Sequence, residues 1–402
     1  MPVRGVAFRL ASELPPEALS LLQDFRLAVN EAVRAGLQAR STSRNSLVKL
    51  AYKDFRKEHP MMYSQHLVCS FEVAANVLRN HRRSVREGRA CAVPYVRRLM
   101  MKAENQAYKL DRENGIVDLP IRAGLHVRLR LVVSRYHRRY LDDPSLSLGS
   151  LTLLPDRVII AFRKGTPKPY VPEAVLSLDT NERSMDGVLA SRERITPVKA
   201  DYSEVAEIQS RHHDRRRRLQ RKKAHDRRTS RRLGRREGRR EHDRVEHRMH
   251  QVADAVLRFA EDNKAAIVLE DLRGAPRRSR GKALSRRLSS WPRRKLHQII
   301  EYKAEWRGVP VVKVDPRYSS RTCPICGRIQ GSRMGAVFEC SCGWRLDRHI
   351  NASLNLLRTA ASAGLEAAGG LRFGPGASQH DVMMVLYGPE KGARPEPNAT
   401  SC

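Results

Sequence analysis

Acidic residues are scarce in this chain of 402 residues, in which 43 Asp and Glu stand against 77 Lys and Arg, for a formal net charge of +34. The imbalance excludes an enzyme with an acidic or neutral surface, and it exceeds the small net charge that solubility needs. It predicts a polyanionic partner instead, because Lys and Arg that neutralise phosphates release condensed counterions. Nucleic acid is the leading class of partner.

Long apolar runs are also absent. No stretch approaches the roughly 20 residues that a membrane-spanning helix needs, and the start of the chain lacks a basic segment followed by an apolar block. These absences exclude a membrane partner and predict a cytoplasmic protein. Hydrophobic residues still form 41% of the chain, which is enough for two or three cores and excludes a disordered basic tail.

Cysteine is scarce as well, at seven residues, but four of the seven fall in one short window. These four are Cys323, Cys326, Cys340 and Cys342. Two close thiol pairs on knuckle turns can close a tetrahedral shell around Zn²⁺, and Gly327 and Gly343 allow the turns. Four thiolates leave no open coordination position, so we predict one structural Zn²⁺ rather than a catalytic one. The alternative is four unrelated free cysteines.

The first 170 residues change their hydrophobic period along the chain. Residues 5–10 alternate like a strand, and helical spacing follows up to about residue 90. From residue 107 the pattern is that of antiparallel strands, at residues 115–119, 126–133, 146–154 and 157–162. We expect a small β-barrel of residues 1–10 and 107–172 with a helical insertion of residues 11–106.

Three carboxylates stand at unusual positions in the second half of the chain. Asp179 and Glu270 each end a short buried-strand run, and Asp347 begins the last helix. If the three converge, the cluster is costly unless cations occupy it. Two Mg²⁺ ions would neutralise the cluster, activate a water and stabilise the departing oxygen of a phosphodiester. The alternative for each residue is a turn or cap role.

Residues 211–240 hold 16 basic and 3 acidic residues and are expected to be helical. Arg makes forked phosphate contacts, so this block predicts an RNA-binding surface, and a solvated helical face is the alternative. His212, His213 and His225 in the block are interpreted as exposed or phosphate-facing rather than as metal ligands. The predicted nucleic-acid contacts are Arg215, Arg216, Arg217, Arg218, Arg221, Lys222 and Lys223.

Five segments of the second half of the chain carry a shared pattern, namely residues 178–182, 268–272, 302–306, 319–323 and 346–352. These segments resemble the sequence blocks of TnpB, a transposon-encoded, RNA-guided DNA nuclease related to type V CRISPR effectors. The order of the blocks and the chain length both match, and the resemblance covers about residues 175–357.

The resemblance implies an α+β multidomain fold. Its parts would be a β-barrel wedge domain (1–10 and 107–172), a helical recognition lobe (11–106), an RNase H-like RuvC nuclease domain (173–322 and 343–360) and a zinc ribbon (323–342). An Arg-rich helical insertion at about residues 205–245 would belong to the nuclease domain. Residues 361–402 are expected to form a poorly ordered tail.

The resemblance also implies a function. Asp179, Glu270 and Asp347 would be the catalytic acids that hold two Mg²⁺, and the protein would carry a guide RNA and cleave double-stranded DNA next to a short flanking motif. No small-molecule substrate is expected, and the location would be the prokaryotic cytoplasm, at the nucleoid when bound to DNA. Two positions depart from the common pattern: Asn181 replaces a Gly, and His349 stands where a second Asp is common.

Two alternatives to a transposon-encoded nuclease stay open. A miniature type V CRISPR effector would perform the same chemistry, and the neighbouring genes would distinguish it. A nuclease-inactive, guided DNA-binding repressor belongs to a different class, and the presence of all three mapped acids argues against it.

Overall fold

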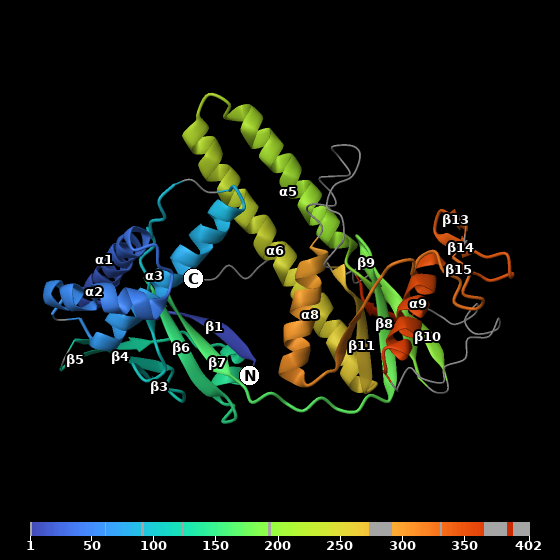
Figure 1. Cartoon of the computed structure of the whole chain (residues 1–402), viewed down its shortest axis with the longest axis horizontal. Helices are drawn as coiled ribbons and strands as arrows, with labels where there is room; N and C mark the ends of the chain where they lie inside the picture. The colour runs from blue at the N-terminus through green and yellow to red at the C-terminus, as the bar shows by residue number, and fades with distance from the viewer. Residues whose placement is uncertain are drawn as a thin grey trace. The chain divides into compact units, whose positions relative to one another are not determined.

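The computed structural model describes residues 2–60, 62–89, 92–122, 124–191, 194–272, 292–329, 332–365 and 384–388. The chain divides into two compact units, Met1–Gly165 and Thr166–Cys402 (Figure 1). None of the helices in the described residues is long and apolar enough to cross a membrane.

The N-terminal unit contains a small helical group and two antiparallel sheets. Its longer helices are α1 (Pro16–Gln38), α2 (Arg44–Glu58) and α3 (Ser64–Arg86). α1 begins with a proline in its first turn, where the missing N–H costs nothing. A short helix, α4 (Arg135–Leu141), lies between the strands of the two sheets in the sequence.

The first sheet has the order β1 (Val3–Arg9), β7 (Arg157–Arg163), β6 (Ser147–Leu154), β2 (Met101–Ala103). The second has the order β3 (Lys109–Asp111), β4 (Ile116–Arg122), β5 (Leu125–Arg130). The antiparallel pairing of β1 with β7 confirms that the first strand joins the later ones.

Two features of this unit differ from the expectation. The described strands form two sheets linked by a bridge between Leu10 and Leu131, not one barrel. β2 also lies inside the segment that was expected to be helical, since three residues are too few to show a period.

The C-terminal unit is built on a six-stranded mixed sheet. β8, β9 and β10 form an antiparallel meander, β11 and β12 extend it in parallel beyond β8, and β16 pairs in parallel with β10. The sheet order is β12 (Val311–Val314), β11 (Ala265–Glu270), β8 (Ala174–Thr180), β9 (Ser184–Ala190), β10 (Ile195–Asp201), β16 (Met384–Tyr387).

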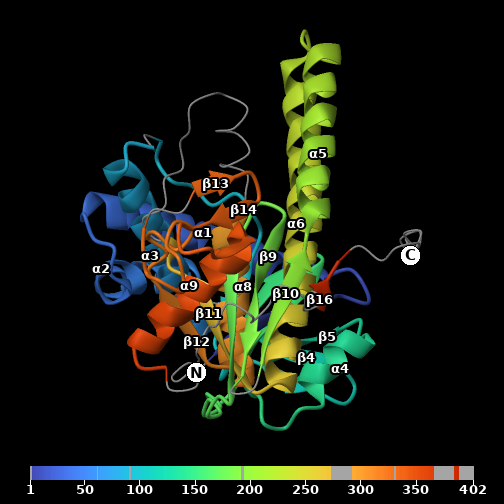
Figure 2. The ribbon, with the colours of Figure 1, turned by 90° about the vertical axis from the view of Figure 1, so that its right-hand side faces the viewer.

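Helices cover both faces of this sheet (Figures 1 and 2). α6 (Arg227–Asp262) and α8 (Arg293–Arg307) pack on one face, and α9 (Arg348–Ser362) packs on the other. Gly187 is required where β9 passes β8, because a Cβ there would overlap the Ser177 carbonyl oxygen. The close approach of the two strands therefore depends on a residue without a side chain.

The basic block forms a helical hairpin. α5 (Ser203–Lys222) runs beside the first half of α6, and Asp226 caps α6 by accepting a hydrogen bond from the Thr229 backbone N–H (2.9 Å). α6 then continues for 36 residues, so the charged half of the hairpin and the apolar half under the sheet are one helix. The insertion expected at about residues 205–245 therefore does not end at residue 245, because α6 continues without a break to Asp262.

The C-terminal tail returns to the sheet. β16 extends the edge beside β10, and the Tyr387 hydroxyl lies 3.3 Å from Gln251 Oε1 on α6. The expectation of a poorly ordered tail therefore does not hold for residues 384–387, because a four-residue strand far from its partner in sequence leaves no periodic signal. Residues 366–383 and 389–402 lie outside the described part of the chain.

Candidate active site

Two of the predicted acids meet at one edge of the six-stranded sheet. Leu176 and Leu178 of β8 pack under α6 and α8, so alternation along the strand turns Asp179 toward the α9 face. β11 runs parallel to β8 with Leu269 opposite Leu178, which places Glu270 next to Asp179 on the same face. The carboxyl ends of two adjacent parallel strands thus bring the two carboxylates together.

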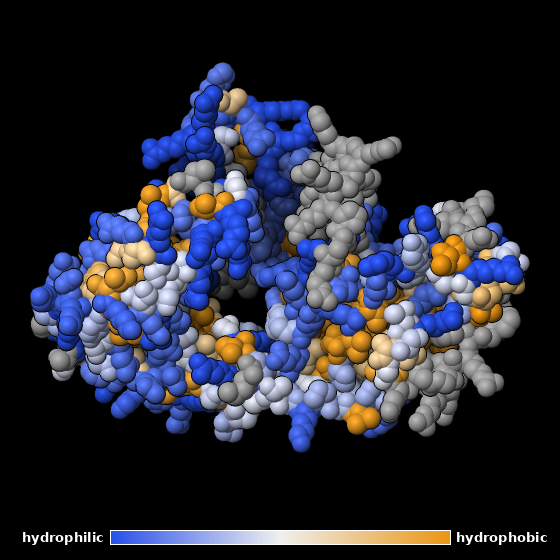
Figure 3. Space-filling view, viewed as in Figure 1, coloured by the Kyte–Doolittle hydropathy of each residue, from blue (hydrophilic) through white to orange (hydrophobic). Residues whose placement is uncertain are grey.

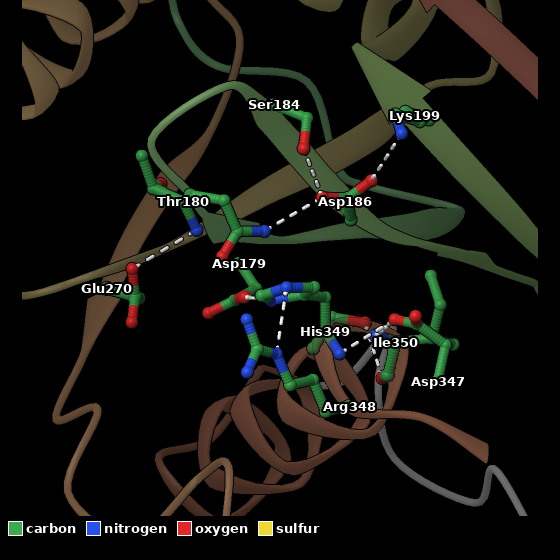
Figure 4. A network of polar contacts seen from close by, with 12 residues as sticks. Asp179, Thr180, Ser184, Asp186, Lys199, Glu270, Asp347, Arg348, His349 and Ile350 are labelled. Atoms are coloured by element: carbon green, nitrogen blue, oxygen red, sulfur yellow. Dashed lines mark hydrogen bonds and ion pairs between the residues drawn. The ribbon is translucent and has the colours of Figure 1, made fainter. Parts of the chain in front are cut away.

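A third carboxylate lies on the neighbouring strand. Asp186 of β9 is directly opposite Asp179 in the antiparallel register and is 6% exposed. Its Oδ2 accepts hydrogen bonds from Ser184 Oγ and from Asn181 Nδ2 (2.8 Å), and Lys199 Nζ lies 3.9 Å from its Oδ1 (Figure 4). Asp186 is therefore satisfied by its own strand and its neighbours.

Burial and mutual repulsion act on the Asp179 and Glu270 pair. Burial raises the pKa of Asp179, an effect that contact with His349 opposes. Burial and then the charge of Asp179 raise the pKa of Glu270 to about 8, although its Oε2 accepts a hydrogen bond from the Thr180 N–H (3.2 Å). Two ionised carboxylates in such a place need a compensating cation.

Asp347 does not join this pair. It is exposed and caps α9, with its Oδ1 accepting hydrogen bonds from the backbone N–H groups of His349 (2.8 Å) and Ile350 (3.2 Å). Among the described residues, no group of three metal-ligating side chains with mutually close ligand atoms includes Asp179, Glu270 or Asp347. In this structure Asp347 therefore has the geometry of a helix cap, which was the alternative to a ligand role.

His349 reaches the site in its place. Its Nδ1 lies 2.8 Å from Asp179 Oδ2, and its Nε2 lies 3.1 Å from Arg348 Nε (Figure 4). Reasoning from the residues alone missed this contact, although His349 was visible as a departure from the family pattern. It placed Asp186 on the return strand of a hairpin and as the nearest substitute for Asp179, but the direct opposition of the two residues comes from the register of the structure.

The opposite face of the same strand end carries a second histidine. Thr180, the residue after Asp179, points its Oγ1 to His297 Nε2 on α8 at 2.7 Å. Burial lowers the pKa of His297 to about 4, so this imidazole is neutral at physiological pH.

The four clustered cysteines form a preassembled site. The ribbon strands are β13 (Ser332–Met334), β14 (Val337–Glu339) and β15 (Arg345–Asp347). All four sulfurs lie within 4.8 Å of one another, with Cys323 to Cys342 and Cys326 to Cys340 both at 3.6 Å. Tetrahedral Zn²⁺ with Zn–S bonds of about 2.3 Å needs sulfurs about 3.8 Å apart, so the cluster fits zinc.

The knuckle turns explain this geometry. Gly327 and Gly343 have φ of 72° and 88°, a region that favours glycine. The backbone N–H groups of these glycines donate to the carbonyls of Cys323 and Cys340, which closes each turn. A backbone hydrogen bond from Cys342 lowers the pKa of the Cys340 thiol to about 7, which favours the thiolate that a metal requires.

The basic hairpin is exposed but not uniformly free. Arg216 is half-buried and pairs with Glu241, and Arg215 lies 3.5 Å from Glu237 although it is exposed. The remaining five predicted contacts are exposed as well. Those are Arg217, Arg218, Arg221, Lys222 and Lys223. The space-filling view shows hydrophilic residues over the upper ends of α5 and α6 (Figure 3).

α6 adds arginines that the predicted contact set omitted. Seven of them line a hollow of about 740 Å³, namely Arg227, Arg228, Arg231, Arg232, Arg235, Arg236 and Arg239. One histidine departs from the expectation: His212 is buried and pairs with Glu237 (2.8 Å), so it holds α5 against α6 instead of facing phosphate. His225, in contrast, is exposed as expected.

Comparisons with known proteins follow the same parts of the chain. Residues 294–356, which contain α8, the cysteine cluster and the start of α9, match the family described as Cas12f1-like, TNB domain. A TnpB-like protein of Methanocaldococcus jannaschii is 26% identical over 247 residues, covering 59% of this chain and 88% of that protein. The chain is therefore similar to TnpB-like proteins and, over a shorter segment, to Cas12f effectors.

A second similar protein matches this chain over only a short part of either sequence. The CRISPR-associated endodeoxyribonuclease Cas12f1 of Sulfoacidibacillus thermotolerans is 44% identical over 75 residues, which is 18% of each chain. The solved structure of the mini-RNA-guided endonuclease CRISPR-Cas_phi3 superposes with a TM-score of 0.55 at 11% identity, over 92% of this chain and 93% of that one. This likeness supports the mixed α/β fold.

Proposed function

We propose that the protein is an RNA-guided DNA endonuclease that cleaves double-stranded DNA next to a short flanking motif. In this proposal the C-terminal unit is an RNase H-like RuvC nuclease domain, and the N-terminal unit supplies the wedge domain and recognition lobe. The observation that carries it is the pair of the buried Asp179 and the half-buried Glu270 at adjacent parallel strand ends, in a strongly basic chain that is similar to TnpB-like proteins.

The carboxylate pair supplies the negative pocket. Asp179 and Glu270 would hold two divalent ions, for which Mg²⁺ is the expected identity. When bound, such ions would supply an activated water and stabilise the leaving oxygen of a phosphodiester, which would leave 5′-phosphate and 3′-hydroxyl ends. The Thr180 N–H steadies Glu270 in the direction of Asp179. The raised pKa values of both acids fit this role, because a cation relieves the repulsion that burial strengthens.

The basic hairpin supplies the positive wall. The arginine-lined hollow on α6 and the exposed basic residues of α5 offer many phosphate contacts to a structured RNA. Sequence recognition would come from base pairing between the guide and the DNA, since the protein itself provides shape and backbone contacts. One Zn²⁺ on the four cysteines would hold the ribbon that leads into α9.

The test begins with the RNA that copurifies with the full-length protein. Sequencing this RNA defines a guide, and double-stranded DNA carrying the matching target with randomised flanks then serves as substrate in Mg²⁺. We expect cleavage next to one flanking motif. Asp179→Asn and Glu270→Gln should remove cleavage and leave RNA retention and guided DNA binding near wild type. Sequence-independent cleavage, or no RNA bound, would contradict the proposal.

RNA retention has its own test on α5. Replacing Arg217 and Arg218 with Gln should flatten the salt dependence of RNA affinity by roughly one unit of log-log slope per lost phosphate contact. Arg216→Gln is the matched control, because this arginine pairs with Glu241 and should affect the hairpin's stability more than the slope. An unchanged slope in the double variant would favour the solvated-face alternative.

A guided DNA-binding protein without nuclease activity is the second candidate. One observation favours it: a histidine, not a third carboxylate, contacts Asp179. Guided DNA binding without cleavage in Mg²⁺ or Mn²⁺ would select this alternative.

A further inference from the structure

A second hollow in the basic hairpin differs in character from the arginine-lined hollow on α6. α5 and α6 lie side by side (Figure 2), and side chains of both helices line this interhelical hollow of about 430 Å³. Its volume is in the range of pockets that take small ligands. Five of its eight lining side chains are basic, which suits an anionic partner. The other three are Leu219, Leu233 and Glu237, so the lining is not uniformly basic.

The two leucines give the interhelical hollow an apolar part. Leu219 on α5 and Leu233 on α6 are both half-buried. A phosphate placed against them would lose water without gaining a hydrogen bond or an opposite charge. The face of a nucleobase, in contrast, can be buried against apolar side chains and can stack on a guanidinium plane. The leucines therefore favour a base over a phosphate.

The carboxylate of Glu237 also disfavours a phosphate in the interhelical hollow. Glu237 is 6% exposed, and its Oε1 lies 2.8 Å from His212 Nδ1, which fixes the side chain in place. A carboxylate repels a phosphate but accepts a hydrogen bond from the exocyclic amino group of a base. The polar and the apolar lining thus point to the same kind of ligand.

One arginine connects the two hollows. Arg236 lines both the interhelical hollow and the arginine-lined hollow. It is exposed, as is Arg218, which lines the interhelical hollow from α5. A nucleotide whose phosphates follow the arginine-lined hollow can therefore turn its base into the interhelical hollow, where guanidinium groups are available for stacking.

We propose that the interhelical hollow binds one unpaired nucleobase of a structured RNA, while the arginines beside it bind the RNA backbone. The inference deepens the proposed function and rests on it for the identity of the partner as RNA. RNA is favoured over duplex DNA because loops and bulges of RNA present unstacked bases, whereas the bases of a duplex are paired. The hairpin would thus recognise an RNA by a structural feature as well as by charge.

The experiment measures RNA affinity by fluorescence anisotropy, with full-length, zinc-loaded protein from which copurifying RNA has been removed. The probe is a synthetic RNA hairpin with one bulged cytosine. Its matched control has an abasic site at the bulge, which removes the base and keeps every phosphate. The cytosine hairpin should bind about tenfold more tightly than the abasic one, as expected for the stacking of one base. This ratio should change little with salt, because both RNAs carry the same charge.

Two uncharged substitutions test whether the base lies in the interhelical hollow. Leu219→Gln and Leu233→Gln make its apolar part polar and keep the net charge, so each should bring the affinity ratio close to one. Arg217→Gln is the matched control, because this arginine of α5 is exposed and is not part of the lining. It should weaken the binding of both RNAs and leave their ratio unchanged. Far-UV circular dichroism checks the folding of each variant.

A crosslinking measurement on the wild-type protein does not depend on how the variants fold. A hairpin with 6-thioguanosine at the bulge is irradiated in the complex, and the attachment point is mapped by mass spectrometry. The crosslink should fall within residues 215–222 or 233–240, which contain the lining of the interhelical hollow.

The outcomes separate this proposal from the proposed function. Equal affinity for the cytosine and abasic hairpins would overturn the proposal, as would a preference that both leucine variants keep or a crosslink outside the two segments. A preference seen only with a bulged DNA hairpin would overturn the assignment to RNA. Base preference without guided cleavage would support the hollow and reject the nuclease, whereas guided cleavage with equal affinities would do the reverse.

Discussion

The two faces of the six-stranded sheet differ in the residues that they carry, because neighbouring residues of a strand point to opposite faces. On the α6 and α8 face the strands contribute Leu176, Leu178 and Ile267 to an apolar core. On the α9 face the intervening positions end in Asp179 and Glu270. Apolar burial stabilises the fold on both faces, since Val175 and Val268 pack in the same apolar cluster as Leu354 of α9. Only the α9 face also keeps carboxylates in a buried place, at a cost in stability.

The largest expected effect separates chemistry from stability on the α9 face. Asp179→Asn should reduce guided DNA cleavage by on the order of 10³-fold, because the site loses one of the two carboxylates that would hold the divalent ions. The free energy of unfolding without divalent ions should stay equal or rise, since a neutral amide relieves the repulsion that raises the pKa of Glu270. Cleavage assays and chemical denaturation measure the two quantities. A large loss of stability would mean that the acid is structural.

A variant of the zinc ribbon tests how strongly the site on the α9 face depends on the zinc site that precedes α9. Cys326→Ser should lower the zinc content from about one ion per chain and reduce cleavage indirectly, because the ribbon leads into the helix that carries His349. Metal analysis by mass spectrometry gives the zinc content. Wild-type protein that contains no zinc would reject the site.

A cavity introduced on the α6 and α8 face should lower stability and leave cleavage almost unchanged, the reverse of the result expected for Asp179→Asn. Leu176→Ala should lower the free energy of unfolding by about 2–5 kcal/mol, because Leu176 is fully buried under α6 and α8. Cleavage per folded molecule should stay within about twofold of wild type if the faces are independent. Denaturation and cleavage at a temperature where both proteins are folded test this. A selective loss of cleavage would show that the two faces are coupled.

Features whose signal lies within a short stretch of sequence could be predicted. Buried strand runs ending in Asp179 and Glu270 and the spacing of the four cysteines were visible because each signal lies within a few residues. The role of Asp347 was not, because a helix cap and a metal ligand have the same sequence signature at a helix start. Only the three-dimensional register shows that His349 faces Asp179 and that Asp186 lies opposite it.

Longer-range features were also hidden. The edge strand at residues 384–387 pairs with β10, almost two hundred residues earlier, so no local pattern predicts it. The burial of His212 against Glu237 likewise depends on how α5 and α6 pair, although both residues lie within the basic block.

The smallest expected effect concerns pH, and here the two faces should act in opposite directions. Burial lowers the pKa of His297 on the α8 face to about 4, below its ordinary value of 6.5. Its contribution to stability is therefore present above pH 6.5 and is lost as pH falls from 6.5 toward about 4, because the unfolded state binds the proton more readily. The pKa of Glu270 on the α9 face is raised to about 8, so its contribution is present below about pH 4.5 and is lost as pH rises through about 8.

His297→Gln should therefore remove part of the acid sensitivity of the C-terminal unit. The Thr180 contact at 2.7 Å can be replaced by the amide, while the titrating group is gone. Relative to wild type, the variant's free energy of unfolding should change less between pH 6.5 and pH 4, by on the order of 1–3 kcal/mol. Denaturation in divalent-free buffer across this range measures the difference, and Glu270→Gln should flatten the profile between pH 4.5 and pH 8 instead. If both variants altered the same pH range, the two faces would share one titrating network and the comparison between them would fail.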